Sequence, residues 1–398
     1  MAPDLDQLEK LRSGASRDLL RRLAREPYSL ALVSALRKQY PPGLVAAASS
    51  LTELRMLGRS KFSRADQMWF TVAGLEQASS ELVSGHIAQR YSSARSIVDL
   101  CTGIGGNLIT LAAHAPVTAV DMDPVHLTMA GLNAAVYDRD AVTLVNDDVQ
   151  QVSMPDTAAV FVDPARRKGQ RRLLEGRSVP PLGWCLSLAD SGAAVAVKVA
   201  PGIPVTLIPA DWEAEFISES RQMRAAVLWS PAMRTTTRRA TLFPAGLALL
   251  PEPGSPVPIA MVGRYITDPD PAVTRAGLVE DLARSLGMWK IDDRIAFLSS
   301  DEPVRTPYGR TMLVEASMPW SRKRLRAAVR AAGAGAVDIR KRGSAVNVDE
   351  LRQSLDLSGD RRLTIVLTRV RDRPWALICS DPEAPALPEQ SAASSATE

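Results

Sequence analysis

The sequence predicts an α/β protein with a parallel sheet at its centre, helices before it and a smaller α+β domain after it. Short apolar runs such as SIVDL, VTAVD and AAVFVD alternate with helical stretches from about residue 95 onward. Strands and helices that take turns along a chain are typical of βαβ units around a parallel sheet. The length of 398 residues exceeds one ordinary domain, so we expect two or three.

The flanking regions show different patterns. Leucines recur at helical spacing up to a break at Pro41-Pro42-Gly43, which predicts a helical N-terminal cap over residues 1–65. The central domain is expected over 66–245, where AEFISES, RAAVLWS and RRATLFP would complete its sheet as antiparallel strands. A proline-rich linker at 244–258 leads into the α+β domain, predicted over 255–380. The polar tail at 381–398 is expected to be disordered.

Composition narrows the function classes. Lys and Arg exceed Asp and Glu by four, a balance that permits an anionic partner without requiring one. Cys101, Cys185 and Cys379 share no pair spacing, and the three histidines form no ligand pattern, so we predict neither disulfides nor a metal site. The polar N-terminus does not resemble a signal peptide, and no apolar run reaches the length of a membrane span, so we expect a cytoplasmic protein.

The segment IVDLCTGIGGN (residues 97–107) predicts a ligand-binding turn. Asp99 closes a strand, and Gly103 and Gly105 lie in a glycine-rich turn that leads into a helix, where the backbone can approach a ligand closely. A tight turn without any ligand would have the same pattern. In nucleoside-binding βαβ units an acid about 20 residues further on holds the ribose, and Asp121 has that position. Asp148 follows the third strand, where it can accept from an adenine amino group.

Together these segments resemble those of class I S-adenosylmethionine (SAM) dependent methyltransferases, which have a Rossmann-like sheet. The resemblance implies that Asp99 faces the methionine amino group, Asp121 holds the ribose, and Asp148 frames the adenine. It also places WFTVAGLEQASS (residues 69–80) over the cofactor, with Gln77 in reach. NAD is the alternative cofactor, but the third glycine of GxGxxG and a phosphate-binding basic residue are missing.

The segment FVDPARRKG (residues 161–169) is the candidate catalytic motif, because ligands bind at the carboxyl ends of parallel strands. It is similar to the D/N-P-P-aromatic motif of nucleic-acid methyltransferases, although Ala and Arg replace its last two residues. We predict that Asp163 and Pro164 orient an acceptor nitrogen, with Asp163 able to take its proton, and that Arg166 and the two cations after it clamp a phosphate. A solvated loop is the alternative for the three cations.

The DPAR form is closer to 5-methyluridine RNA methyltransferases, which need a cysteine nucleophile at the end of the next strand. Here that stretch reads VKVAPG and has no cysteine, while Cys185, on the preceding helix, is expected to be a small buried thiol. We therefore expect direct transfer of the methyl group to a nitrogen.

The C-terminal region, with its segments DPDPAV, IRKRG and LTR, resembles the THUMP-like domain of bacterial SAM methyltransferases. The resemblance implies that tRNA or rRNA is the partner. A concentration of basic residues suits contacts to phosphates, although a solvated arginine-rich face is the alternative. These residues are Arg322, Lys323, Arg324, Arg326, Arg330, Arg340, Lys341, Arg342, Arg361, Arg362, Arg369 and Arg371.

The function predicted from these features is SAM-dependent methylation of a base nitrogen in RNA. One alternative is a methyltransferase that acts on a protein or a small molecule. Another is a catalytically silent RNA-binding protein that uses SAM structurally.

Overall fold

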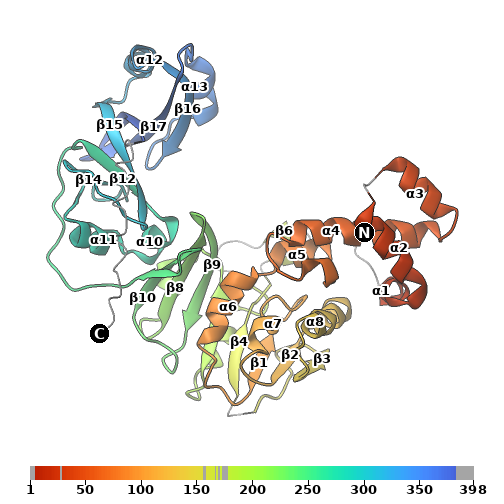
Figure 1. Cartoon of the computed structure of the whole chain (residues 1–398). Coiled ribbons are helices and arrows are strands. Elements are labelled where there is room, and N and C mark those ends of the chain that lie inside the picture. Colours follow the sequence, from red (N-terminus) through yellow and green to blue (C-terminus); the bar gives the residue numbers. More distant parts are fainter. Residues whose placement is uncertain are drawn as a thin grey trace, which may run out of the picture. The chain divides into compact units, whose positions relative to one another are not determined.

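The computed structural model describes residues 5–26, 29–155, 158–165, 167–168, 171–172 and 178–381. The chain divides into two compact units, Met1–Pro251 and Glu252–Glu398, and the boundary lies inside the proline-rich segment 244–258 (Figure 1). Beyond Asp381, the tail expected to be disordered lies outside the described residues. Within the described ranges, no helix has both the length and the apolar character needed to span a membrane.

The N-terminal segment is helical, as the leucine spacing predicts, and has a core of its own. Leu11, Leu19, Leu36 and Leu51 are buried together between its helices. The last helix begins with a proline at its first position, where the missing N–H costs no hydrogen bond, and this explains the break at Pro41-Pro42-Gly43. The helices are α1 (Leu5–Arg12), α2 (Gly14–Arg25), α3 (Leu30–Arg37) and α4 (Pro42–Gly58).

The same unit contains a nine-stranded sheet. Its strands in chain order are β1 (Ile97–Leu100), β2 (Val117–Val120), β3 (Val142–Val145), β4 (Ala159–Val162), β7 (Val195–Val199), β8 (Glu213–Glu219), β9 (Gln222–Trp229), β10 (Arg238–Phe243) and β11 (Leu247–Leu249). Their order in the sheet is β11-β10-β8-β9-β7-β4-β1-β2-β3. The five strands from β3 to β7 are parallel, which confirms the prediction for the central domain.

The antiparallel prediction is wrong for one of the last strands. β9 is antiparallel to both β7 and β8, as expected, but β10 is parallel to β8. The reason is topological: after β9 the chain reverses again, and β10 pairs with β8 on its far side instead of with β9. β11 then turns back antiparallel to β10 and adds an edge strand within the segment expected to be a linker.

Helices cover the parallel strands, and β1, β4 and β7 are buried along their whole length and therefore read as largely apolar runs. Figure 1 shows α6, α7 and α8 side by side, with α7 against β2 and α8 against β3. The helical elements are η1 (Ala65–Gln67), α5 (Val72–Gln77), α6 (Glu81–Gln89), α7 (Leu108–Leu111), α8 (Pro124–Val136), α9 (Leu182–Ser187) and η2 (Val205–Leu207). After β4, a short hairpin of β5 (Arg167–Lys168) and β6 (Arg171–Arg172) follows.

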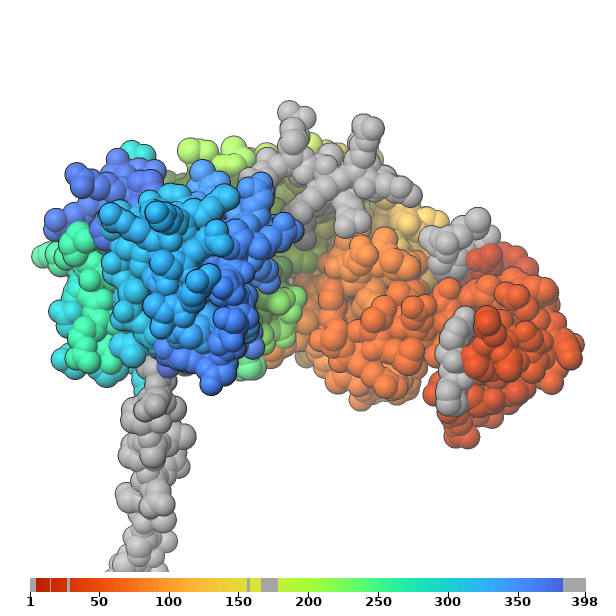
Figure 2. Space-filling model, turned by 90° about the horizontal axis from the view of Figure 1, so that it is seen from above, coloured from red at the N-terminus to blue at the C-terminus, as the bar shows by residue number. Residues whose placement is uncertain are grey.

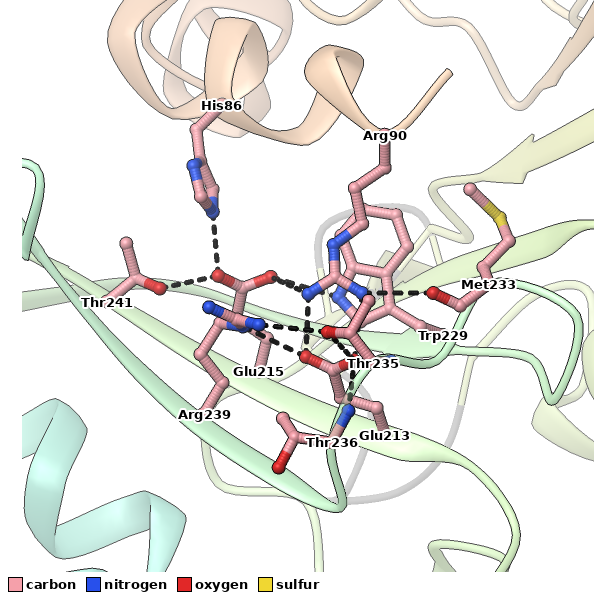
Figure 3. Close-up of polar contacts among 10 residues, drawn as sticks. All are labelled: His86, Arg90, Glu213, Glu215, Trp229, Met233, Thr235, Thr236, Arg239 and Thr241. Atoms are coloured by element: carbon pink, nitrogen blue, oxygen red, sulfur yellow. Dashed lines mark hydrogen bonds and ion pairs between the residues drawn. The ribbon is translucent and has the colours of Figure 1, made fainter. Parts of the chain in front are cut away.

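A buried polar cluster joins α6 to the amino edge of the sheet (Figure 3). Glu213 is fully buried and accepts from Arg90 through both carboxylate oxygens, at 2.6 and 2.8 Å, and from Arg239 Nε at 3.0 Å. Glu215, also fully buried, accepts from His86 Nε2 at 2.7 Å and from Trp229 Nε1 at 2.9 Å. Each buried carboxylate therefore has several donors, which is the condition for a stable buried charge.

The C-terminal unit is a seven-stranded sheet with helices, in the order β13-β14-β12-β15-β18-β17-β16. Successive residues of its central strands enter opposite cores: Ile365 and Ile378 pack with Leu325, whereas Val366 and Leu377 pack with Phe297. Its elements are β12 (Tyr265–Pro269), α10 (Pro271–Ala276), α11 (Val279–Leu286), β13 (Trp289–Lys290), β14 (Leu298–Ser300), β15 (Gly309–Pro319), α12 (Arg322–Ala331), β16 (Ala334–Lys341), α13 (Val348–Ser354), β17 (Arg361–Val370) and β18 (Arg373–Ser380).

Two sequence segments on which the THUMP-like resemblance rests meet in this unit. Asp268 of DPDPAV, which is buried, pairs with Arg340 and Arg342 of IRKRG at 2.8 Å each. Asp270, in the same segment, caps α10 by accepting from Ala272 N. These residues therefore have a structural role.

Candidate functional site

A pocket of about 650 Å³ lies at the carboxyl edge of the parallel strands in the first unit. It is lined from four segments, residues 74–78, 101–107, 121–126 and 163–165. Of the residues singled out in the sequence, Gln77, Gly103, Asp121, Asp163 and Pro164 line this pocket. Parallel strands bring their carboxyl ends to one edge, and segments that are distant in sequence therefore meet there.

The two predicted glycines have different roles. Gly103 lines the pocket with a positive φ of 58°, and a Cβ there would meet open space. Gly105 has a φ of 87°, but a Cβ would lie 3.0 Å from the Cα of Ala130 in α8. Gly105 is therefore required for the close packing of the turn on α8, and it does not itself line the pocket.

Asp121 links the glycine-rich turn to the end of β2. Its Oδ2 accepts from Gly103 N at 2.7 Å, and its Oδ1 accepts from Asp123 N at 2.9 Å. Each carboxylate oxygen keeps a lone pair that can accept from a ribose hydroxyl. Asp123 caps α8 by accepting from Val125 N and His126 N at 2.9 and 3.1 Å.

Asp99 is almost fully buried and, like Gly105 and Asp148, is not part of the pocket lining; neither of its carboxylate oxygens has a hydrogen-bond partner in the described structure. Burial raises the pKa of Asp99 to about 8. The Oδ1 of Asn107, in the pocket wall, is likewise buried and without a partner. Buried acceptors of this kind are rare unless a ligand or an ordered water supplies the donors. An ammonium group, such as that of a methionine moiety, fits this requirement in charge and in hydrogen bonding.

Asp148 lies apart from the pocket lining. It is exposed and accepts from Gln150 N at 3.0 Å in the turn after β3. Its role toward an adenine stays a prediction. A neighbour that the sequence analysis did not single out, Asn146, donates from Nδ2 to the backbone oxygen of Asp121 at 2.8 Å.

Asp163 lies at the carboxyl end of β4, at the pocket wall. Its Oδ2 accepts from Lys198 Nζ at 2.6 Å and from Asn107 Nδ2 at 3.3 Å. The residue after Pro164, Ala165, is held by a bridge to Val179. Arg166, the third predicted catalytic residue, lies outside the described residues.

Cys185 is fully buried on α9, in agreement with its interpretation as a buried thiol. Its Sγ donates to the carbonyl oxygen of Pro180 at 3.9 Å, and burial raises the pKa of the thiol to about 12. Cys101 lines the pocket, and burial also raises the pKa of this thiol well above its ordinary value. A nucleophilic cysteine requires the thiolate, which both environments disfavour.

Three polar residues of the site are not among those predicted from the sequence. Lys198 and Asn107 contact Asp163, and Lys61 holds the pocket segment at α5 by donating to Leu75 O and Ala78 O at 2.7 and 2.8 Å. A signal existed for Lys198, because a lysine inside the apolar run AVAVKVA is unusual for a buried strand. Asn107 directly follows the glycines of the turn, whereas nothing in the sequence distinguishes Lys61 from an exposed lysine.

Two family models match segments of the chain. Residues 94–177 match the RNA cap guanine-N2 methyltransferase model, and residues 309–381 match the THUMP domain-like model. The chain is also 31% identical over 94 residues to trimethylguanosine synthase of Schizosaccharomyces pombe, covering 22% of this chain and 39% of that protein. The first match includes β1 to β4 with the glycine-rich turn and Asp163.

Longer matches cover most of the chain. A crystal structure described as a methyltransferase of Porphyromonas gingivalis W83 shares the fold, with a TM-score of 0.71 over 96% of this chain and all of that chain, at 20% identity. Uncharacterized SAM-dependent methyltransferases of two Mycobacterium tuberculosis strains, CDC 1551 and H37Rv, are 36% identical over 312 residues, covering 76% of this chain and 85% of theirs. The protein therefore belongs to this family of SAM-dependent methyltransferases, and its cofactor is SAM.

Proposed function

We propose that the protein methylates a base nitrogen of RNA by direct transfer from SAM, without a cysteine adduct. One observation carries the proposal: Asp163-Pro164 follows β4 at the wall of the cofactor pocket, within the segment that matches the RNA cap guanine-N2 methyltransferase model. A nitrogen acceptor with an N–H donor matches a carboxylate placed at this point.

When bound, SAM would supply an electrophilic methyl group; transfer to the acceptor nitrogen would break the sulfur–carbon bond and leave S-adenosylhomocysteine (SAH), and the proton lost from the nitrogen would pass to Asp163 or to water. The contribution of the chain is positioning. Asp163 accepts from the acceptor nitrogen, and Asp99, Asn107 and Asp121 hold the cofactor. The buried, protonated state of Cys185 supports transfer without a covalent enzyme–RNA intermediate.

The C-terminal unit supports an RNA substrate, but through fewer cations than the sequence predicts. Arg340 and Arg342 pair with the buried Asp268 and are structural. Ion pairs also engage Arg322, Arg330, Arg361, Arg362 and Arg369. On α12, however, Lys323, Arg324 and Arg326 are exposed and have no acidic partner among the described residues. Figure 2 turns this face of the unit toward the reader, and we place the RNA contact there.

The test is mass spectrometry of modified nucleosides in RNA from cells with and without the protein. One N-methylated nucleoside should be lost from tRNA or rRNA and restored by the wild-type chain and by Cys185→Ser, but not by Asp163→Asn. Purified protein should then methylate RNA from the deficient cells. Labelling of a protein or metabolite instead of RNA would contradict the proposal, as would an adduct trapped on 5-fluorouridine RNA that Cys185→Ser abolishes.

The RNA contact on α12 has its own test. Replacing Lys323, Arg324 and Arg326 by glutamine should weaken RNA binding and make its dependence on salt less steep, because fewer phosphate contacts release fewer counterions. Replacing three ion-paired arginines, Arg330, Arg361 and Arg362, by glutamine is the matched control and should have a smaller effect. Equal effects of the two sets would contradict the placement.

A further inference from the structure

The lysine at the end of β7 is the feature that the proposed chemistry does not yet use. Lys198 is 6% exposed and belongs to a strand whose other residues are buried and apolar. Removing an ammonium from water is costly unless a close partner compensates. Its partner is Asp163 Oδ2 at 2.6 Å, and the carboxylate side chain keeps 24% exposure toward the pocket.

The two carboxylate oxygens of Asp163 have different surroundings. Oδ2 of Asp163 accepts from both Lys198 and Asn107, at 2.6 and 3.3 Å. Oδ1 has no such donor among the described residues and remains for an N–H of the acceptor. The lysine therefore fixes which oxygen of Asp163 faces the substrate.

We propose that Lys198 is the positioning residue of Asp163, acting through the carboxylate and not on the cofactor or the phosphates. The role toward an acceptor rests on the proposed function. Asn107 links the residue that faces the acceptor to the cofactor. Its Nδ2 donates to Asp163, and its Oδ1 is one of the unsatisfied acceptors assigned to the cofactor. Cofactor binding at Asn107 then holds the same side chain that orients Asp163.

A pair that served stability alone would have the same short distance, so the experiment needs a matched control. Lys290 in the C-terminal unit is 7% exposed and pairs with Glu280 at 2.9 Å and Asp293 at 3.2 Å. It is a lysine of similar burial with carboxylate partners, far in sequence from the cofactor pocket. Lys290→Met therefore measures the effect of losing a buried lysine pair as such.

The measurement is kcat for RNA methylation together with the SAH dissociation constant, for the wild type, Lys198→Met, Lys198→Arg, Asp163→Asn and the double variant Lys198→Met/Asp163→Asn. We expect Lys198→Met to lower kcat on the order of 100-fold while the SAH constant stays within about threefold, since only acceptor positioning is lost. Lys198→Arg should recover about tenfold. The double variant should be no slower than the slower single variant, and Lys290→Met should keep kcat within about twofold.

Two results would overturn the inference. One is a wild-type kcat in Lys198→Met, and the other is a double variant whose loss is the product of the two single losses. Thermal unfolding of the wild type, Lys198→Met, Asp163→Asn and the double variant needs no acceptor, and it separates this failure from that of the proposed function. If the wild type methylates no RNA but the losses in Tm of the Lys198 and Asp163 variants are less than additive, the pair stands and the RNA substrate is wrong. Additive losses would contradict the pair itself.

Discussion

Carboxylates are buried both at the amino edge and at the carboxyl edge of the sheet in the first unit. The two edges differ in the hydrogen-bond donors that surround these carboxylates. At the amino edge, Glu213 and Glu215 are fully buried, and their donors include Arg90 and His86 (Figure 3). At the carboxyl edge, Asp99 is buried to nearly the same degree, but neither of its carboxylate oxygens has a hydrogen-bond partner in the described structure. Burial alone therefore does not distinguish an architectural acid from a binding acid.

The pKa values of the two acids express this difference. Burial opposes ionisation of Glu213, but the hydrogen bonds from Arg90, Thr235 and Arg239 outweigh it and lower the pKa to about 2. For Asp99 burial prevails and raises the pKa to about 8. An acid whose partners are complete stabilises the fold, whereas we expect an acid that lacks them to bind a cationic ligand.

The largest effect is expected at the amino edge. Arg90→Met leaves Glu213 and Glu215 buried without their shared guanidinium, and should lower the free energy of unfolding by about 3–5 kcal/mol. Denaturant unfolding of the full chain measures this loss. Arg59→Met, which removes an exposed pair with Asp66, is the control and should unfold like the wild type. A stability loss in Arg90→Met no greater than that of the control would contradict the stabilising role of the buried pairs at the amino edge.

An intermediate effect is expected at Asp121, and it should appear in binding. Asp121→Ala should weaken SAH binding by about 1.5–3 kcal/mol, because a charged acceptor for the ribose hydroxyls is lost. Isothermal calorimetry is the measurement. Asp123→Ala removes the cap of α8 and a second carboxylate from the pocket lining, but not the acceptor assigned to the ribose; it should lower stability and leave SAH affinity within about threefold. If Asp123→Ala weakened SAH binding and Asp121→Ala did not, Asp123 and not Asp121 would be the acid that holds the ribose.

The smallest effect is expected at Lys61. Its ammonium holds the carbonyl oxygens at the end of α5, next to Gln77, and touches the cofactor pocket only through this segment. Lys61→Met should weaken SAH binding by about three- to fivefold, because removing one partner of a few hydrogen bonds costs about 1 kcal/mol. Calorimetry with the variant would contradict this if SAH affinity fell as far as in Asp121→Ala.

Much of the fold and part of the site could be predicted from the sequence. Apolar runs that alternate with helices located β1 to β4, and the spacing of Asp99 and Asp121 placed both at one edge. The direction of β10 could not be predicted, because a strand's partner depends on the path of the chain and not on its own residues. The role of Lys198 could not be predicted for a related reason, because it depends on a contact with Asp163, which follows a different strand.

We infer that Asp99 lacks partners because it binds the ammonium of the cofactor, and calorimetric titration with SAH between pH 6 and pH 8 tests this role most directly. Binding requires the ionised carboxylate, and a pKa raised to about 8 keeps Asp99 protonated below that pH. The wild type should therefore release a proton on binding, and its affinity should fall by up to about tenfold per pH unit as the pH decreases. Asp99→Asn should bind SAH weakly and equally at both ends of this range. Wild-type affinity that is the same at pH 6 and pH 8, or undiminished affinity in Asp99→Asn, would contradict the account.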